Sequence, residues 1–326
     1  MGNTVNWGIL GTGSIARKFV TGLAALPDAR PAAVGSRAQK TADEFGREFG
    51  IPRRHPSYDA LAEDPEVDVI YVATPHSLHR ENTLLCLDAG KAVLCEKPFA
   101  VNADQADEMA AAARRRGLFL MEAMWTRFLP AMAALRRLLD ERAVGEVRMI
   151  AADFGFRAGL DPTGRLFDPA LGGGGLLDVG VYPVSLASMV FGGPPSRVAG
   201  LADLGRTGVD EQNGMVLGYD GGRLALLCSA IRTRTAHELH VYGTDGRIRV
   251  PDWWHADHLL VHRGGGEERI DAPIEGNGYH YQAAEVMSCL ADGRTESDRM
   301  PLDETVGVMR TLDRIREQWG LRYPME

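Results

Sequence analysis

Short apolar runs alternate with helical patterns through the first third of the chain, and this alternation restricts the possible folds more than any other feature. Predicted strands cover residues 4–10, 30–35, 67–73, 92–95 and 119–121, and helical patterns fill the intervals. Strands and helices that alternate at this length predict a parallel sheet with right-handed crossovers. Helices then cover both faces of the sheet, which explains why its strands are apolar throughout.

The pattern changes after a predicted helix at residues 130–140. Strand-like runs joined by hairpin-type turns, such as Asp220-Gly221-Gly222 and Asp245-Gly246, predict a largely antiparallel sheet. These strands are expected at residues 146–156, 197–204, 214–219, 223–230, 238–243 and 259–262, with covering helices at 177–191, 279–291 and 302–319. One face of that sheet still needs a cover, and a partner chain is one candidate.

We therefore expect an α/β chain of two domains. Residues 1–123 form a dinucleotide-binding domain with a Rossmann-type, doubly wound parallel sheet. Residues 124–326 form an α+β domain with a large, mostly antiparallel sheet, which is expected to bind the substrate and to mediate dimerisation.

Composition excludes several classes of protein. The chain has 326 residues, is 45% hydrophobic and carries a net charge of −8, which argues against disorder and against binding of nucleic acid or an anionic membrane. The spacing of its four cysteines predicts neither a disulfide framework nor a bound metal. We find no run of about 18–20 apolar residues and no basic-then-apolar leader, so the chain is expected to be soluble and cytoplasmic.

The first predicted strand runs into a glycine-rich loop that precedes a helix. Gly11 permits a tight turn, Gly13 lets backbone amides approach a pyrophosphate, and Ala16 allows close packing of helix on strand. The phosphates would then lie at the positive end of the helix. This G-x-G-x-x-A pattern predicts a dinucleotide site that includes Gly11, Thr12, Gly13, Ser14 and Ile15.

The end of the second predicted strand indicates which dinucleotide binds. NAD enzymes usually carry Asp or Glu there to hydrogen-bond the ribose hydroxyls. This chain has Gly35-Ser36-Arg37 instead, and no acid follows until Asp43. Because a hydroxyl and an arginine suit a 2′-phosphate, Ser36 and Arg37 favour NADP over NAD.

A second loop, Ala73-Thr74-Pro75-His76, follows a predicted strand at the same carboxyl edge of the sheet, where ligands of such sheets bind. Thr74, Pro75 and His76 are expected to line the nicotinamide side of the cofactor site, together with His79. For both histidines a position at the surface or at a helix start is favoured over metal ligation.

A third loop at this edge is Glu96-Lys97-Pro98. Pro98 restricts the backbone of Lys97 and stiffens the chain at that point. A lysine partly screened from water at this edge can lose its proton or stabilise a nearby anion. We therefore count Glu96 and Lys97 among the cofactor-site residues and Lys97 among the catalytic candidates.

The second domain contains a run of four glycines, Gly172-Gly173-Gly174-Gly175, followed by Asp178 and Tyr182. A spacing of four places two side chains on one face of a continuous helix. Pro183 disfavours helical geometry at Tyr182, so the regular helix is expected to begin near that residue. Asp178 and Tyr182 are candidate catalytic residues.

Aromatic side chains are candidates for the wall of a substrate pocket. Trp125, Phe154 and Trp254 could pack on the apolar faces of a ring-shaped substrate. An ordinary place in the core or at an interface explains each of them equally well.

In combination and order, these motifs resemble the Gfo/Idh/MocA oxidoreductase family. The resemblance covers nearly the whole chain through G-x-G-x-x-A at 11–16, A-T-P-H at 73–76, E-K-P at 96–98 and G-G-G-x-L-x-D-x-G-x-Y at 173–182. Residues 121–128 further resemble the branch that holds dimeric dihydrodiol dehydrogenase and NADP-dependent D-xylose dehydrogenase. The resemblance implies dinucleotide binding in the N-terminal domain, substrate binding between the domains, and a homodimer or higher homo-oligomer.

The resemblance also implies roles for individual residues. The lysine of E-K-P is the usual catalytic residue of the family, which carries over to Lys97, and the Lys97–Pro98 bond is expected to be cis. Many members have histidine where this chain has Tyr182. Tyrosine is typical of the dihydrodiol and glucose–fructose branches, which argues against an inositol substrate.

The expected reaction transfers a hydride between NADP and a cyclic polyol, at C1 of an aldopyranose or in a trans-dihydrodiol. The hydroxyl proton passes either to Tyr182 assisted by the Lys97 ammonium, or to neutral Lys97 with Tyr182 as donor, while Asp178 orients a second hydroxyl. A dinucleotide-binding regulator without turnover and an NAD-dependent glycoside hydrolase are the alternative functions.

Overall fold

The computed structural model describes residues 4–326, which form two compact units. The first unit contains the chain up to Ala100 together with Asp104–Trp125 and Glu275–Thr305. The second contains Val101–Ala103, Thr126–Ile274 and Val306–Glu326. Each sheet therefore belongs to one unit, whereas residues 275–305 pack with the N-terminal part of the chain although they come late in the sequence.

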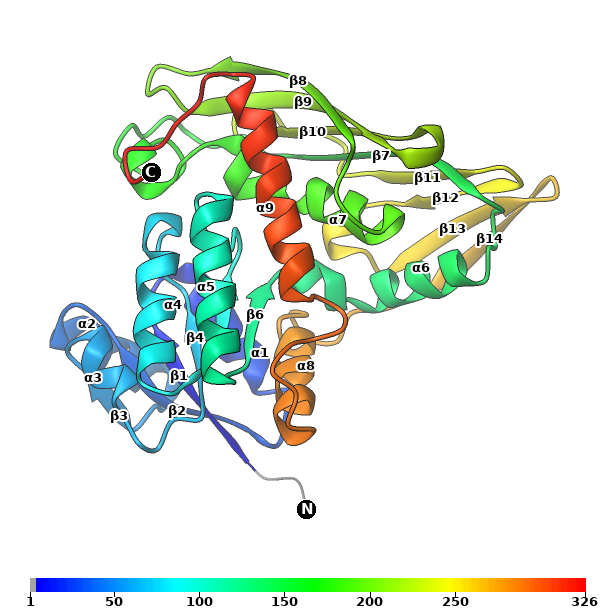
Figure 1. Cartoon of the computed structure of the whole chain (residues 1–326). Helices are drawn as coiled ribbons and strands as arrows, with labels where there is room; N and C mark the ends of the chain where they lie inside the picture. The colour runs from blue at the N-terminus through cyan, green and yellow to red at the C-terminus, as the bar shows by residue number, and fades with distance from the viewer. Residues whose placement is uncertain (1–3) are drawn as a thin grey trace. The chain divides into compact units, whose positions relative to one another are not determined.

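A parallel sheet forms the centre of the first unit (Figure 1). Its strands are β1 (Val5–Leu10), β2 (Ala29–Gly35), β3 (Arg53–His55), β4 (Val69–Val72), β5 (Ala92–Glu96) and β6 (Leu120–Ala123). The helices are α1 (Ser14–Leu23), α2 (Gln39–Phe49), α3 (Tyr58–Ala62), α4 (His79–Asp88), α5 (Ala103–Arg116) and α8 (His280–Ala291). The strand order is β3-β2-β1-β4-β5-β6, and every neighbouring pair is parallel, so the predicted Rossmann-type sheet is confirmed.

Successive residues of β1 show how helices cover both faces of this sheet. Trp7 contacts Phe19 of α1 edge-on, and Phe19 stacks on Tyr71 of β4. The next residue, Gly8, faces the opposite way, where a Cβ atom would lie 3.3 Å from Leu61 of α3. A strand buried on both sides cannot alternate polar and apolar residues, which accounts for its uniformly apolar sequence.

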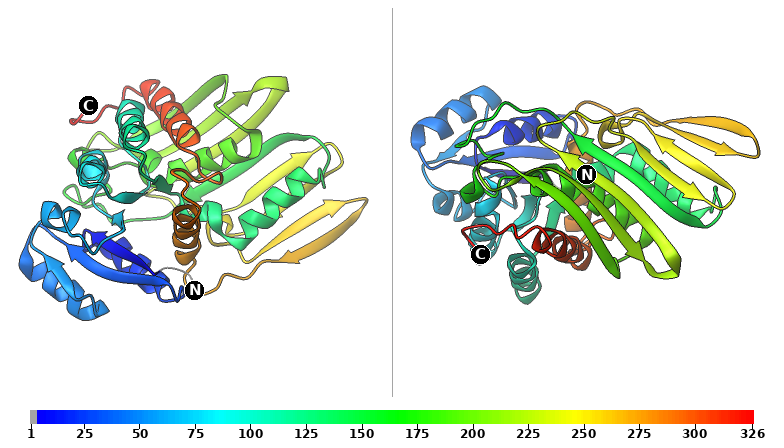
Figure 2. Two further views of the ribbon diagram at one scale, coloured as in Figure 1. Left: turned by 60° about the horizontal axis from the view of Figure 1, so that its bottom comes forward. Right: turned by 90° about the horizontal axis from the view of Figure 1, so that it is seen from above.

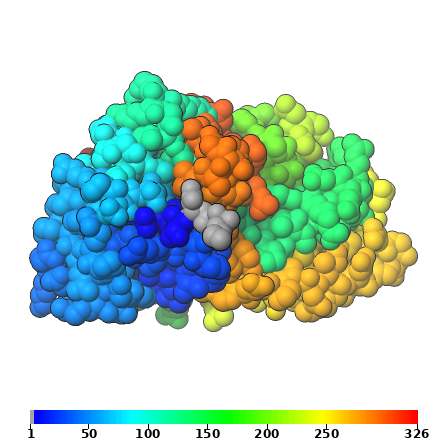
Figure 3. Space-filling model, turned by 90° about the horizontal axis from the view of Figure 1, so that it is seen from below, coloured from blue at the N-terminus to red at the C-terminus, as the bar shows by residue number. Residues whose placement is uncertain are grey.

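Helix α8 joins the first unit by packing on α1. In Figure 3 the orange part of the chain, which includes α8, lies next to the blue N-terminal part. The Asn277 side chain, just before α8, donates a hydrogen bond of 2.7 Å to the carbonyl of Lys18. Gly22 makes this approach feasible, because a Cβ there would lie 2.8 Å from Asn277 Oδ1.

The second unit is built on an eight-stranded sheet of order β14-β13-β12-β11-β7-β10-β9-β8. Its strands are β7 (Val147–Gly155), β8 (Arg197–Leu204), β9 (Asp210–Tyr219), β10 (Arg223–Ala230), β11 (Leu239–Gly243), β12 (Gly246–Val250), β13 (His258–Arg263) and β14 (Gly266–Asp271). The helices are α6 (Pro130–Asp140), α7 (Val181–Phe191) and α9 (Leu302–Glu317), whose first turn is grouped with the first unit. All pairs are antiparallel except β7 with β10, so the mostly antiparallel sheet is confirmed.

Helices α6, α7 and α9 lie on one face of this sheet (Figures 1 and 2). On the other face the structure leaves large apolar side chains exposed, among them Leu201, which is 84% exposed. Among the described residues, one helical stretch, 169–191, is long and apolar enough to cross a membrane. Most of it is buried within the protein, and positive φ angles at Gly172 and Gly174 interrupt it, as suits a core segment.

Candidate active site

The glycine-rich loop has the geometry that a dinucleotide needs. Gly11 has a φ of 102°, and a Cβ there would lie 2.9 Å from the carbonyl oxygen of Ala73 at the end of β4. Gly13 is the N-cap of α1, no side chain caps that end within the part of the chain described, and the space beside Gly13 is open. The first-turn amides of α1 are therefore free of side-chain competitors for a phosphate.

The end of β2 presents a hydroxyl and a cation. Ser36 is buried, and its Oγ lies 2.6 Å from Oγ1 of Thr41 in α2. Arg37 is exposed. Burial raises the pKa of Tyr58 while Arg37 acts in the opposite direction, so this guanidinium lies near the Tyr58 phenol. Asp43, the next acid in the sequence, accepts a hydrogen bond of 2.9 Å from Gln39 within α2.

His76 and His79 begin a short 3-10 turn and helix α4, so their helix-start position is confirmed, whereas the expected surface position is wrong because both are buried. His79 lies between two of the predicted loops: its Nδ1 is 2.7 Å from the carbonyl of Pro98, and its Nε2 is 2.9 Å from the carbonyl of Thr74. Burial lowers the pKa of His79 to about 4 and outweighs both carbonyls. The neutral ring has one N–H, so it donates to one of the two loops at a time.

Hydrogen bonds to a buried carboxylate fix the conformation of the Glu96-Lys97-Pro98 loop. The Lys97–Pro98 peptide is cis, as expected. The buried Glu96 carboxylate accepts hydrogen bonds from the Tyr71 hydroxyl and, at 3.2 Å, from the Lys97 N–H. Lys97 itself is half-buried. Glu96 therefore stabilises the conformation of the loop, whereas its contact with a cofactor stays a prediction.

In the second unit, Asp178 and Tyr182 lie at the start of one helical segment. Residues Leu176–Gly180 form a π-helical turn that continues into α7 at Val181, close to the predicted start of the regular helix. Turns of this type occur frequently at functional sites. Asp178 is buried and accepts a hydrogen bond of 2.8 Å from Arg165, a residue for which the sequence carries no signal because it lies in an irregular loop.

Asp210, which the sequence did not single out, stabilises the start of the Leu176–Gly180 turn through its side chain. Its buried Oδ2 accepts hydrogen bonds of 2.7 Å from the Leu176 N–H and from Asn213 Nδ2. Gly174, with a φ of 113°, makes room for it, because a Cβ there would lie 2.5 Å from Asp210 Oδ1. Burial raises the pKa of Asp210 to about 7.

The predicted aromatic residues separate into two groups. Phe154 stacks on Trp254 at a ring-centroid distance of 5.2 Å and also lies 5.2 Å from the Tyr182 ring, so these three side chains are brought together in the second unit. Trp125 belongs to the first unit, where it stacks on Tyr279 with centroids 4.6 Å apart. Tyr279 was missed from the sequence, where it is only the first residue of a helical pattern.

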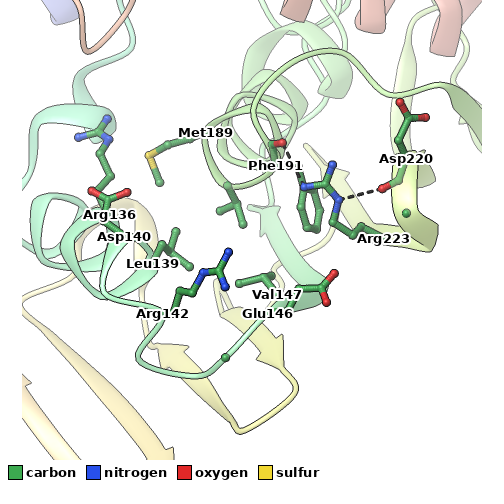
Figure 4. A pocket seen from close by; sticks show the side chains of 13 residues that line it. Arg136, Leu139, Asp140, Arg142, Glu146, Val147, Met189, Phe191, Asp220 and Arg223 are labelled. Carbon is green, nitrogen blue, oxygen red and sulfur yellow. Dashed lines mark hydrogen bonds between the residues drawn. The ribbon is translucent and has the colours of Figure 1, made fainter.

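A separate cavity of about 670 Å³ lies in the second unit, near the end of α7 that is remote from Tyr182 (Figure 4). Arg223 stabilises one wall of the cavity by donating hydrogen bonds to the backbone carbonyls of Asp220 (2.9 Å) and Phe191 (3.4 Å). The lining carries three arginines and three acids and includes none of the predicted site residues. We assign this cavity no part in the reaction.

The chain belongs to the Gfo/Idh/MocA oxidoreductase family. Residues 5–124 match the family described as the oxidoreductase family with an NAD-binding Rossmann fold, and residues 132–249 match the GFO/IDH/MocA C-terminal domain. The protein is accordingly an NAD(P)-dependent oxidoreductase, as its two sheets and glycine-rich loop indicate.

Several relatives are similar along their whole length. The chain is 39% identical over 330 residues to trans-1,2-dihydrobenzene-1,2-diol dehydrogenase of Xenopus tropicalis, covering 98% of this chain and 99% of the relative. It is 38% identical to the Homo sapiens protein of the same name, covering 99% of each. Among solved structures, it resembles aldose-aldose oxidoreductase from Caulobacter crescentus in complex with glycerol (TM-score 0.90, 28% identity, 98% of both chains). It also resembles KijD10, a 3-ketoreductase from Actinomadura kijaniata with NADP and TDP-benzene (TM-score 0.86, 27% identity, 97% of this chain and 98% of that one).

Asp210 makes stability depend on pH in a definite direction. Its pKa is about 7 in the folded protein and near 3.8 in the unfolded chain, so the unfolded chain loses this proton first. The contribution to stability is therefore full below pH 4 and lost as the pH rises to about 7. We expect Asp210→Asn to remove this loss, on the order of 2–4 kcal/mol, in urea unfolding of parent and variant at several pH values. A parent–variant difference that does not change with pH would contradict this assignment.

Proposed function

We propose that the protein is an NADP-dependent dehydrogenase that acts on a cyclic polyol, either an aldopyranose at C1 or a trans-dihydrodiol. The observation that carries this proposal is the grouping of Tyr182 with the Phe154–Trp254 pair at the start of a helical segment that also presents Asp178. A phenol for proton transfer, a carboxylate for a second hydroxyl and two ring faces suit a cyclic substrate with neighbouring hydroxyls. The names of the dihydrodiol dehydrogenase and aldose oxidoreductase relatives support the same substrate class.

NADP fits the residues of the first unit. The Gly11–Ile15 loop and the amides at the start of α1 would hold the pyrophosphate, and Ser36 with Arg37 would hold the 2′-phosphate. The loops that carry Thr74, Pro75, His76 and Lys97 would line the nicotinamide end, with His79 joining them from below. When bound, the nicotinamide supplies a carbon that accepts or returns the hydride.

We assign Lys97 and Tyr182 to the proton transfer. A phenol with a pKa near 10 is a weak base at neutral pH, so Tyr182 accepts the hydroxyl proton only if a cation favours its phenolate, which is the role proposed for Lys97. Asp178, paired with Arg165, is proposed to accept a hydrogen bond from a second substrate hydroxyl. This ion pair fixes the orientation of the Asp178 carboxylate.

Reduced nicotinamide should appear when the protein is mixed with NADP and D-xylose, D-glucose or a trans-dihydrodiol. We expect Lys97→Ala and Tyr182→Phe each to lower kcat by about 10²–10⁴-fold, because each removes a participant in proton transfer. Binding of NADPH, measured by its fluorescence, should be retained in both variants. Lys18→Ala, which removes an exposed lysine from α1, serves as the matched control and should leave kcat unchanged. If the parent protein neither forms nor consumes reduced nicotinamide with a broad panel of polyols and their oxidised products, the proposed function is refuted.

Arg37 should decide between the two dinucleotides. Arg37→Ala removes the proposed partner of the 2′-phosphate, so KM for NADP should rise about tenfold or more while KM for NAD changes little. Arg47→Ala, at the far end of α2, removes another exposed arginine and should change neither value. Equal changes for NADP and NAD in Arg37→Ala would assign the 2′-phosphate to other residues.

We further propose that the exposed face of the eight-stranded sheet binds a second copy of the chain. Val216 pairs across the sheet with Leu226 of β10 and with Ala199 of β8, and Leu226 pairs with Ala151 of β7. These residues form one row on one face, where Val216 and Leu226 are 41% and 40% exposed. A row of apolar side chains that the described helices leave uncovered suits a two-fold interface. Separately, we propose a cytoplasmic location, because all four cysteines are free thiols, which suits a reducing compartment.

Sedimentation should give a mass of at least twice the single-chain 35.4 kDa. The variant with both Val216→Arg and Leu226→Arg should sediment as a monomer and still bind NADPH, because its changes lie on the sheet face alone. Leu160→Arg is the control, since Leu160 is equally exposed, at 41%, but lies in the loop after β7. A parent protein that sediments as a monomer would exclude the proposed interface.

A further inference from the structure

The loop before β11 places His237 under strain. His237 has a φ of 60°, and among the residues described only Arg142 and Asp252 are other non-glycine residues with positive φ. Such a conformation persists where the surroundings impose it, and it is frequent near functional sites. Here the Asp153 carboxylate imposes it, by accepting hydrogen bonds from the N–H of His237 (2.6 Å) and of Glu238 (3.0 Å).

The two ring nitrogens of His237 have different partners. Nε2 lies 2.6 Å from the carbonyl oxygen of Gly155, which can only accept. Nδ1 lies 3.2 Å from Nε1 of Trp254, whose indole N–H can only donate. With these partners, Nε2 donates and Nδ1 accepts. The Asp252 carboxylate, 4.0 Å from Nδ1 and 76% exposed, is too far away to compete for that nitrogen.

This hydrogen bond sets the orientation of the Trp254 ring. Trp254 lies two residues after Asp252, which has a positive φ, and it is half-buried, so part of its ring is open to solvent. With its indole N–H held by His237, its face stacks on Phe154 at an interplanar angle of 23°. The edge of the His237 ring meets Phe154 at 5.2 Å, and Phe154 in turn lies 5.2 Å from Tyr182.

We propose that His237 is a positioning residue that determines specificity: it holds the Trp254 ring parallel to Phe154 and so selects ring-shaped polyols over acyclic ones. The inference rests on the proposed function and deepens it by naming the residue that sets the substrate class. A flat apolar face of a pyranose or cyclohexadiene gains contact from an aligned aromatic wall. A flexible acyclic polyol presents no such face and gains little.

The test is a double-mutant cycle between His237 and Trp254. His237→Gly keeps a residue that tolerates the left-handed backbone and removes the acceptor for the indole. Trp254→Phe preserves a ring face and removes the donor. We expect His237→Gly to raise KM for a cyclic polyol about five- to tenfold, to leave kcat within about twofold, and to leave KM for an acyclic polyol such as glycerol unchanged.

In the Trp254→Phe background, the same substitution should change KM little, since the hydrogen bond is already absent. His255→Gly is the matched control: the His255 and Trp254 ring centroids are also close, at 5.6 Å, but His255 is exposed, and its replacement should leave KM unchanged. Additive changes in KM, or an equal loss for cyclic and acyclic substrates, would overturn the inference.

A second measurement does not depend on turnover. The emission of Trp254 without cofactor is the difference between the spectra with and without Trp254→Phe, taken in the parent and in the His237→Gly background. It should shift to the red in His237→Gly because the released indole meets water. If the parent oxidises no cyclic polyol, the proposed function fails, and this emission alone decides whether His237 orients Trp254. An unchanged emission would overturn that role.

Discussion

Burial of the parallel strands on both faces is the constraint on which the rest of the structure depends. β4 and β5 are buried along their whole length, and their polar side chains Tyr71 and Glu96 hydrogen-bond to each other inside the protein. Chemistry can appear only where the chain leaves the sheet. The loops that carry Gly11, Ser36, Thr74 and Lys97 follow β1, β2, β4 and β5, which are neighbours in the strand order. Their convergence on one edge is therefore a consequence of topology, and Gly11 marks the closest approach, against the carbonyl of Ala73.

Buried or half-buried carboxylates recur beside the segments to which function is assigned. Glu122 accepts from the N–H of Phe99 at 3.2 Å just after Lys97, Asp210 accepts from that of Leu176 just before Asp178, and Asp153 accepts from that of His237. In each case the chain has irregular backbone whose N–H groups face the protein interior and need an acceptor. A carboxylate has capacity for several donors at once, so it can hold a bend that no helix or strand would satisfy. The acids of this chain are thus partly structural, although the composition alone shows only a net charge of −8.

Local signals predicted most of the fold because they have local causes. The glycine loop, the turn at Asp220-Gly221-Gly222 and helix α6 each follow from the conformational preferences of a few adjacent residues. β3 and β14 were missed because their sequences, Arg-Arg-His and Gly-Glu-Glu-Arg-Ile-Asp, are short and polar, and pairing with a neighbour defines them instead.

The same reasoning separates the site residues that sequence could reveal from those that it could not. Lys97, Asp178 and Tyr182 lie in motifs with fixed spacing. Arg165, Asp210 and His237 act across 13, 34 and 17 residues of chain, on Asp178, Leu176 and Trp254 respectively. No period or motif encodes such a distance, since the intervening strands and loops set it. A sequence can therefore indicate which residues do the chemistry more readily than which residues orient them.

The adjacent residues Trp253 and Trp254 show that a ring facing the proposed substrate site can be oriented separately from a ring packed in the core. Trp253 is 1% exposed, and its indole donates to the backbone carbonyl of Asp153 at 2.9 Å, so its loss would leave a large cavity. Trp254 is half-buried and depends on His237 for its direction. Both indoles are hydrogen-bonded, but only Trp254 has part of its ring exposed. The Trp254 ring can therefore reorient while Trp253 stays packed in the core. On this proposal, changes at His237 alter selectivity for ring-shaped substrates and leave the buried Trp253 and its hydrogen bond in place.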